Sequence, residues 1–258
     1  MTPLVEMLGR VVLAFLGWLG AVVLVALRTA RRLAVLDRAE LFRWFVHFGA
    51  RSLGLGAAAG ALTGATVVLQ AGVYANQFGA RLYTGWAAGY GLLWEFGPLV
   101  LGLLMSARIG ARNAAELALL TIDGQIEGLK GVSLDPHRIL VAPRVIAAIL
   151  SIVALSMVTF LVAVGFETVA AYLMLGLPAR VFLESFTDML RLSDVAAGLL
   201  KSLGFALAIA LVSTTAGLRV RGGAQGVGRA AANAVFASCA TIFALDFVLT
   251  PLLARALG

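Results

Sequence analysis

Long apolar runs, separated by short polar segments, make up most of this chain. An α-helix needs about 20 apolar residues to cross a bilayer, and it satisfies its own backbone polar groups there. The pattern therefore predicts an all-α integral membrane protein with a single domain over residues 1–258. Five runs are long enough to be transmembrane helices: 45–74, 86–120, 145–175, 195–218 and 231–256.

The first apolar run, residues 11–27, is shorter and lies near the lower limit for a span. A secretory signal would end in small residues at a cleavage site, whereas this run ends in the basic segment 28–32. Its length alone leaves two arrangements open: a crossing helix, or a helix that lies in the membrane interface.

The distribution of charge orients the predicted spans. Residues 28–51 carry six arginines against Asp37 and Glu40, and cytoplasmic loops are enriched in Lys and Arg. This places the N-terminal segment in the cytoplasm, and the loops 121–144 and 219–229 return to the same side. The loop 219–229 is rich in glycine and arginine and contains no acidic residue, which predicts a flexible turn.

Composition supports the membrane assignment. The chain is 61% hydrophobic and 13% charged, with mean hydropathy +0.99, whereas a soluble domain is about half apolar and about a quarter charged. The net charge of +7 is explained by the loops and does not indicate a nucleic-acid partner. Cys239 is the single cysteine, and His47 and His137 are isolated from it, so no metal site is predicted.

Signatures of enzymes and nucleotide-binding proteins are missing. Lys130 and Lys201 each follow leucine rather than the glycine of a P-loop. The glycine-rich run 222–228 follows no predicted strand, so it does not match a dinucleotide-binding fingerprint. We therefore expect neither catalysis nor a cofactor in this chain, and energy for uphill transport must come from another chain or from an ion gradient.

Several ionisable side chains fall within the predicted spans, where they are costly and usually face a bundle interior or a wet cavity. Glu95 and Lys201 lie in the outer halves of their spans, and we interpret them as substrate-binding candidates. A purely structural ion pair between them is the alternative. Asp246 is expected to make a structural hydrogen bond, and Glu167 to be solvated near the outer surface.

Arg108, Arg112 and Glu116 recur at intervals of four residues, which places them on one helix face. They lie near the cytoplasmic end of the second span, so we predict a structural charge cluster there. Small residues also recur at intervals of four in the first of the five predicted spans, at Gly56, Gly60 and Gly64. Such a stripe lets a second helix approach closely, either within one subunit or between two subunits.

The segment 121–131 is predicted to be a polar helix between two spans. In a chain without a nucleotide site, such a helix is a candidate for contact with a separate ATPase. Asp123 and Glu127 would form an acidic pair at i,i+4, which a basic groove on the partner would complement. The predicted docking residues are Asp123, Gln125, Glu127 and Leu129.

Several motifs in order resemble the MlaE-type permease family, the membrane subunits of ABC transporters that work with MCE proteins. The family pattern is close to R-E-x-G-P, G-R-x-G-A, A-E-L-G, E-Q-I-x-A-L and G-x-D-P, followed by a P-R pair. The matching stretches here are Glu95-Phe96-Gly97-Pro98, Ala107-Arg108-Ile109-Gly110-Ala111, Ala115-Glu116-Leu117, Gln125-Ile126-Glu127-Gly128-Leu129, Val132-Ser133-Leu134-Asp135-Pro136 and Pro143-Arg144; residues 223–230 and 245–250 resemble its C-terminal signatures.

The resemblance implies a fold and a set of partners. The fold is an N-terminal interfacial elbow helix at residues 11–27 and five spans, with a cytoplasmic coupling helix at 121–131. The assembly is a homodimer in a bacterial inner membrane, with the N-terminus on the cytoplasmic side and lipid as substrate. The implied partners are an ABC ATPase subunit that holds ATP and Mg, an MCE-domain protein on the outer side and a small STAS-type cytoplasmic protein.

The chain departs from the family pattern at several positions. Trp94 stands where the family usually has arginine, and Ala107 replaces a glycine. Asp123-Gly124 interrupts a stretch that otherwise favours a helix. Because tryptophan cannot offer a cation to a lipid phosphate, Lys201 becomes the expected anion contact, with Trp94 as a neighbouring substrate-binding candidate.

The sequence therefore predicts a permease subunit that moves phospholipid or a related lipid between the inner membrane and the cell envelope. The alternative is an ion-coupled secondary transporter of a hydrophobic or small solute. That class favours duplicated halves and broken midplane helices, and the sequence shows neither. An intramembrane enzyme would need a nucleophile or metal set that the sequence does not offer.

Overall fold

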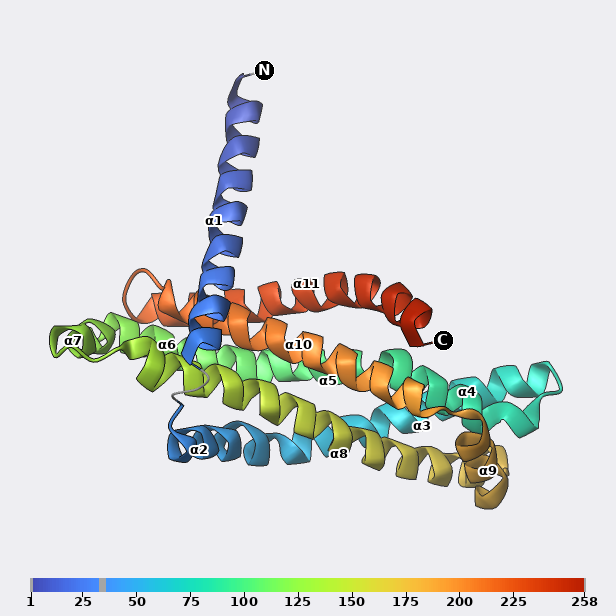
Figure 1. Ribbon diagram of the computed structural model, residues 1–258. Helices are drawn as coiled ribbons and strands as arrows, with labels where there is room; N and C mark the ends of the chain where they lie inside the picture. The colour runs from blue at the N-terminus through green and yellow to red at the C-terminus, as the bar shows by residue number, and fades with distance from the viewer. Residues whose placement is uncertain (1, 33–35, 258) are drawn as a thin grey trace.

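The computed structural model describes residues 2–32 and 36–257, which form helices joined by short loops, with no β-strand among them. Figure 1 shows the long helices side by side in a bundle, with α1 crosswise to them. Six stretches of the described chain are long and apolar enough to cross a membrane. The predicted class, an all-α membrane protein, is confirmed. The α-helices are α1 (Thr2–Arg32), α2 (Arg38–Gly49), α3 (Leu53–Gln77), α4 (Thr84–Gly91), α5 (Gly97–Met105), α6 (Ala111–Ile122), α7 (Gln125–Gly131), α8 (Ala142–Leu175), α9 (Ala179–Met189), α10 (Leu192–Leu218) and α11 (Ala224–Leu257).

The second predicted span is a composite of five helical segments rather than one regular helix. Two π-helical turns, η4 (Leu92–Phe96) and η5 (Ser106–Gly110), separate α4, α5 and α6. Pro98, in the first turn of α5, has no N–H to donate, which favours the break before it. Gly97 is required there, since a Cβ at this position would lie 2.7 Å from the Leu92 carbonyl oxygen. Such π turns occur often at functional sites.

The glycine stripe packs α3 against α8 of the same chain. A Cβ at Gly60 would lie 2.4 Å from the Thr159 carbonyl oxygen, and one at Gly64 would lie 2.4 Å from that of Ala163. At Gly56 the nearest atom is the Thr159 hydroxyl oxygen at 3.1 Å. The two backbones therefore meet where a larger residue would clash. Of the two arrangements left open by the sequence, the structure shows packing within one subunit.

Helix α1 is longer than the predicted run 11–27, and its first turns lie apart from the bundle. Figure 1 shows it crossing the other helices near the end where α6 and α7 lie. Among the α1 side chains that the structure describes, the buried ones are Val25 and Thr29, in its C-terminal half. Arg32 then forms an ion pair with Asp135 at 2.8 Å. The loop that contains Asp135 thus holds the end of α1.

At the opposite end of the bundle, the amphipathic helix α9 covers α4. Phe182 is buried, and its carbonyl oxygen would lie 2.2 Å from a Cβ at Gly85. The ring of Phe186 lies over Gly89, where a Cβ would be 2.4 Å from it. The outer segment expected between two spans is therefore a packed helix, and it fixes the start of α4, which leads into η4.

Candidate functional site

A buried lysine joins three helices at the η4 turn. Lys201, on α10, is fully buried, and its Nζ lies 2.6 Å from the Trp94 carbonyl oxygen. The same atom lies 2.8 Å from Glu95 Oε2 and 2.9 Å from Oδ1 of Asp246 on α11. Two of the three N–H donors of this ammonium group form hydrogen bonds, to Trp94 and Glu95, and Asp246 lies within ion-pair distance without forming a hydrogen bond to it.

The arrangement changes the role expected for Lys201. Its side chain is 0% exposed, whereas that of Glu95 is 42% exposed. Because these contacts enclose its ammonium group, Lys201 is not accessible to an anionic headgroup. The expectation of a direct anion contact at Lys201 therefore does not fit this conformation. Asp246, expected to make only a hydrogen bond, is an ion-pair partner.

The cluster carries more negative than positive charge. One ammonium lies between two carboxylates, and the hydroxyl of Thr250 donates to Glu95 Oε1 at 3.2 Å. A carboxylate can accept about four hydrogen bonds, so Glu95 retains acceptor capacity on its exposed side. The open group at this site is thus an acceptor rather than a cation.

Trp94 has a structural contact in place of the cation usual in the family pattern. Its ring nitrogen donates to Oδ1 of Asp194 at 2.8 Å, and its ring stacks on Tyr90 at 5.5 Å between centroids. Asp194 also caps α10 by accepting from the Arg191 backbone N–H at 2.8 Å. Because Trp94 is buried, it positions η4 against α10 and is not itself open to a substrate.

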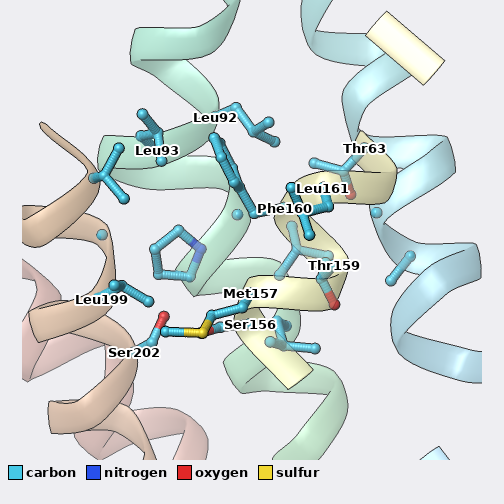
Figure 2. Close-up of a pocket in the computed structure, with 18 residues that line it drawn as sticks. Thr63, Leu92, Leu93, Ser156, Met157, Thr159, Phe160, Leu161, Leu199 and Ser202 are labelled. Carbon is cyan, nitrogen blue, oxygen red and sulfur yellow. The ribbon is translucent and has the colours of Figure 1, made fainter. Parts of the chain in front are cut away.

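The other face of η4 lines an apolar pocket of about 280 Å³. Figure 2 shows Leu92 and Leu93 on one side of it, with Phe160 of α8 and Leu199 of α10 around it. Met157 and Leu161 line the pocket and are themselves exposed, so it opens at the outside of the bundle. The five-residue π turn therefore separates an apolar pocket from the charged cluster.

A second charged cluster lies where α6 meets α8. Glu116 contacts Arg112 Nε at 2.9 Å and Arg144 Nη1 at 3.4 Å, and His47 Nε2 lies 3.6 Å from it. The Arg144 side chain is only 7% exposed, and its guanidinium carbon lies 3.9 Å from the centroid of the Trp44 ring. The sequence identified the pair at i,i+4 but missed the partners from distant helices.

Arg108 does not join that cluster. Its Nε donates to the Ser52 hydroxyl at 3.2 Å, and its Nη2 donates to the Arg51 carbonyl oxygen. Arg108 lies in the π turn η5, whereas Arg112 and Glu116 lie on α6. The predicted cluster of all three residues is therefore not observed: Arg112 pairs with Glu116, whereas Arg108 binds Ser52 and Arg51.

The predicted coupling helix is divided. Asp123 follows the end of α6, and Gly124 has φ 71°, a left-handed conformation that breaks the helix before α7. Asp123 and Glu127 therefore do not share one continuous helix, and the expected acidic pair at i,i+4 is wrong. Glu127 instead pairs with Lys130 at 3.2 Å, and Gln125 is exposed on the same short helix. Ile126 is buried and Leu129 half-buried.

Glu167 also departs from expectation. It was expected to be solvated, but its side chain is fully buried within α8. Neither carboxyl oxygen has a hydrogen-bond partner in the part of the chain that the structure describes. Distance from the helix end was a poor guide to exposure, because Ala163, one turn earlier on the same face of α8, packs against Gly64 of α3. Among the same described residues, no three His, Cys, Asp or Glu side chains gather as metal ligands would.

Comparison with known proteins shows the family. A profile described as "Permease MlaE" matches residues 41–252. The chain belongs to the MlaE permease family. Similar proteins include a probable ABC transporter permease protein of Rickettsia typhi, which is 32% identical over 213 residues covering 83% of this chain and 82% of the relative. The resemblance inferred from the motifs is thereby confirmed.

Two further relatives match over a smaller part of the chain. A probable ABC transporter permease protein of Synechocystis is 32% identical over 181 residues, which cover 70% of this chain and 69% of the relative. Protein TRIGALACTOSYLDIACYLGLYCEROL 1, chloroplastic, of Arabidopsis thaliana is 31% identical over 156 residues, 60% of this chain and 45% of that protein. These names support a multi-pass membrane permease subunit rather than an enzyme.

Proposed function

We propose that this permease subunit moves phospholipid or a related lipid between a bacterial inner membrane and the cell envelope. A separate ABC ATPase, which holds ATP and Mg, would drive the movement. The observation that carries the proposal is the Glu95 carboxylate, which is held by a buried lysine and remains open on one side within a membrane span. The lipid in the name of the Arabidopsis relative supports the choice of substrate class.

Glu95 is the proposed headgroup contact, and Lys201 is a positioning residue. The ammonium of Lys201 fixes one oxygen of Glu95 and holds it beside Asp246. The exposed face of Glu95 can then accept a hydrogen bond from a hydroxyl or amine of a lipid headgroup. Trp94 positions the turn through Asp194.

A homodimer would enclose this site. Helix α11, which supplies Asp246 and Thr250, has an outer face with large exposed aromatic side chains. One chain alone leaves that face and Glu95 open, and closed two-fold assemblies are the commonest oligomers. A second copy is therefore the proposed partner for this face. Its exposed aromatic residues are Phe236, Phe243 and Phe247.

The remaining partners follow from the two ends of the bundle. The short helix α7, with Gln125, Glu127 and Leu129, is the proposed contact for the ATPase, with Asp123 at its edge. Excess arginine at this end supports a cytoplasmic position for it and for the N-terminus, and α1 is the proposed elbow in the membrane interface. An MCE-domain protein at the outer end and a small STAS-type protein in the cytoplasm complete the proposed assembly.

The test uses the complex that copurifies with the ATPase, reconstituted in phospholipid vesicles. We expect phospholipid to copurify and to move only with ATP. Glu95→Gln should reduce transport about tenfold or more, because a charged acceptor contributes about 1.5–3 kcal/mol to a hydrogen bond. Lys201 keeps Asp246 as its counter-ion in this variant, so the fold should persist.

Glu184→Gln is the matched control, since this exposed carboxylate lies on α9 and pairs only with Arg180 in the described contacts. It should transport normally. Transport that follows an ion gradient in the absence of the ATPase would contradict the proposal and favour a secondary transporter. Normal transport and normal bound lipid in Glu95→Gln would remove Glu95 from the site.

A further inference from the structure

The basic loop after α10 borders a pocket that the proposed transport site does not use. This pocket, of about 420 Å³, lies between α1, α10 and α11. Ala14 and Trp18 of α1 form one wall, and Arg219, Arg221 and Arg229 lie around it. Arg219 Nη1 donates to the Gly17 carbonyl oxygen at 2.8 Å, which joins the loop to α1.

The charge of this pocket is not balanced by nearby acids. None of its three arginines forms an ion pair with a carboxylate in residues 2–32 and 36–257. No acidic residue occurs between Arg219 and Asp246 in the sequence. By contrast, Arg32 and Arg112 each have a carboxylate within 3 Å. Three guanidinium groups therefore surround one pocket without an anion.

The surroundings of the pocket indicate where an anion would come from. Helix α1 has large apolar side chains exposed before and after the pocket-lining residues, among them Leu13 and Leu19. Such a helix, crosswise to the spans, places its apolar face in the membrane interface. Anionic lipids are enriched at the cytoplasmic surface, and basic pockets between helices bind their headgroups there.

We propose that this pocket binds the phosphate of an anionic phospholipid of the adjacent leaflet. The planar guanidinium groups of Arg221 and Arg229 match the oxygens of a phosphodiester, and Arg219 fixes the wall formed by α1. The acyl chains would lie along the apolar face of α1. The bound lipid would therefore join α1 to α10 and α11. The site rests on the proposed cytoplasmic orientation of this end, but it does not depend on which substrate is transported.

The experiment compares lipid retention in the full complex. Wild-type protein and the double variant Arg221→Gln, Arg229→Gln are placed in nanodiscs of equimolar phosphatidylcholine and phosphatidylglycerol, then released for native mass spectrometry. Because each arginine near an anionic surface contributes about 1 kcal/mol, the double variant should bind phosphatidylglycerol at least about tenfold more weakly. Phosphatidylcholine retention should be unchanged.

The matched control is Arg31→Gln with Arg138→Gln, which removes the same charge at the same end without touching this pocket. It should retain phosphatidylglycerol like the wild type. Equal retention by the wild type and the pocket variant would overturn the proposal. So would displacement of the lipid by inorganic phosphate at equal concentration, which would indicate a site for a soluble anion.

The ATPase provides the remaining check. If the pocket variant retains phosphatidylglycerol but no longer copurifies with the ATPase, the arginines contact that protein and the lipid assignment is wrong. Loss of phosphatidylglycerol with normal ATP-dependent transport would support this site while leaving the transport function intact. Failure of lipid transport in the wild type, with normal retention here, would instead contradict only the proposed function.

Discussion

Glu95 and Glu116 lie on the same composite span, and each contacts a buried cation from another helix, Lys201 and Arg144 respectively. Around Glu95, one cation lies between two carboxylates, and the second is Asp246. Around Glu116, the proportion is reversed, since one carboxylate lies among two arginines and a histidine. The first cluster has excess acceptors and the second has excess donors.

The difference indicates that the Glu95 cluster can bind a ligand, whereas the Glu116 cluster is structural. Glu95 is partly exposed and has acceptor capacity to spare, so an incoming headgroup can use it without breaking an existing contact. Glu116 has both oxygens engaged, and Arg144 beneath it is shielded by the Trp44 ring. A glutamate in this span can therefore be a ligand contact or a structural ion-pair partner, according to how many cations surround it.

Removal of the shared cation should have the largest effect. Lys201→Met leaves Glu95 and Asp246 close together without a counter-ion, and loss of one member of a buried ion pair costs about 3–5 kcal/mol. The midpoint of thermal unfolding in detergent should fall sharply. The triple variant with Glu95→Gln and Asp246→Asn should recover most of the stability without recovering transport. Equal stability of Lys201→Met and wild type would show that the cluster is not an ion-pair network.

The second cluster should be the next most sensitive. Glu116→Gln leaves the buried Arg144 without its carboxylate, and we expect a loss of about 2 kcal/mol, because the Trp44 ring retains part of the stabilisation. Chemical unfolding monitored by tryptophan fluorescence measures the change. Glu127→Gln, on the exposed helix α7, serves as the control and should unfold at the wild-type midpoint. A larger loss of stability in Glu127→Gln than in Glu116→Gln would show that the second cluster is not the more important of the two for stability.

Glu167 extends the comparison to a carboxyl group without a cation. Because neither oxygen has a partner among the described residues, Glu167→Leu removes an unsatisfied polar group from an apolar region. We expect stability to rise by about 1–3 kcal/mol. The same substitution at Glu95 should not stabilise the protein, because it would leave Lys201 with a single counter-ion. Destabilisation by Glu167→Leu would show that this carboxyl group has a partner in the assembled protein.

The sequence predicted the parts of this comparison that depend on local spacing. Apolar runs identified the spans, and the interval of four residues identified the pair of Arg112 with Glu116. It did not predict that Asp246 lies beside Lys201, because no spacing relates residues on different helices. It also did not predict that Arg108 bonds to Ser52 and Arg51, because spacing along one helix does not identify partners on another.

The smallest effect should come from the part of the second cluster that the sequence did identify. The Arg112 side chain is 40% exposed, and its pair with Glu116 is a half-solvated contact at i,i+4. Such pairs contribute about 0.2–1 kcal/mol, so Arg112→Gln should change the unfolding free energy only slightly, and less at high salt. Arg144 still neutralises Glu116 in this variant, which gives a direct contrast with Glu116→Gln. If Arg112→Gln were as destabilising as Glu116→Gln, the exposed Arg112 rather than the buried Arg144 would provide most of the stability of the Glu116 cluster.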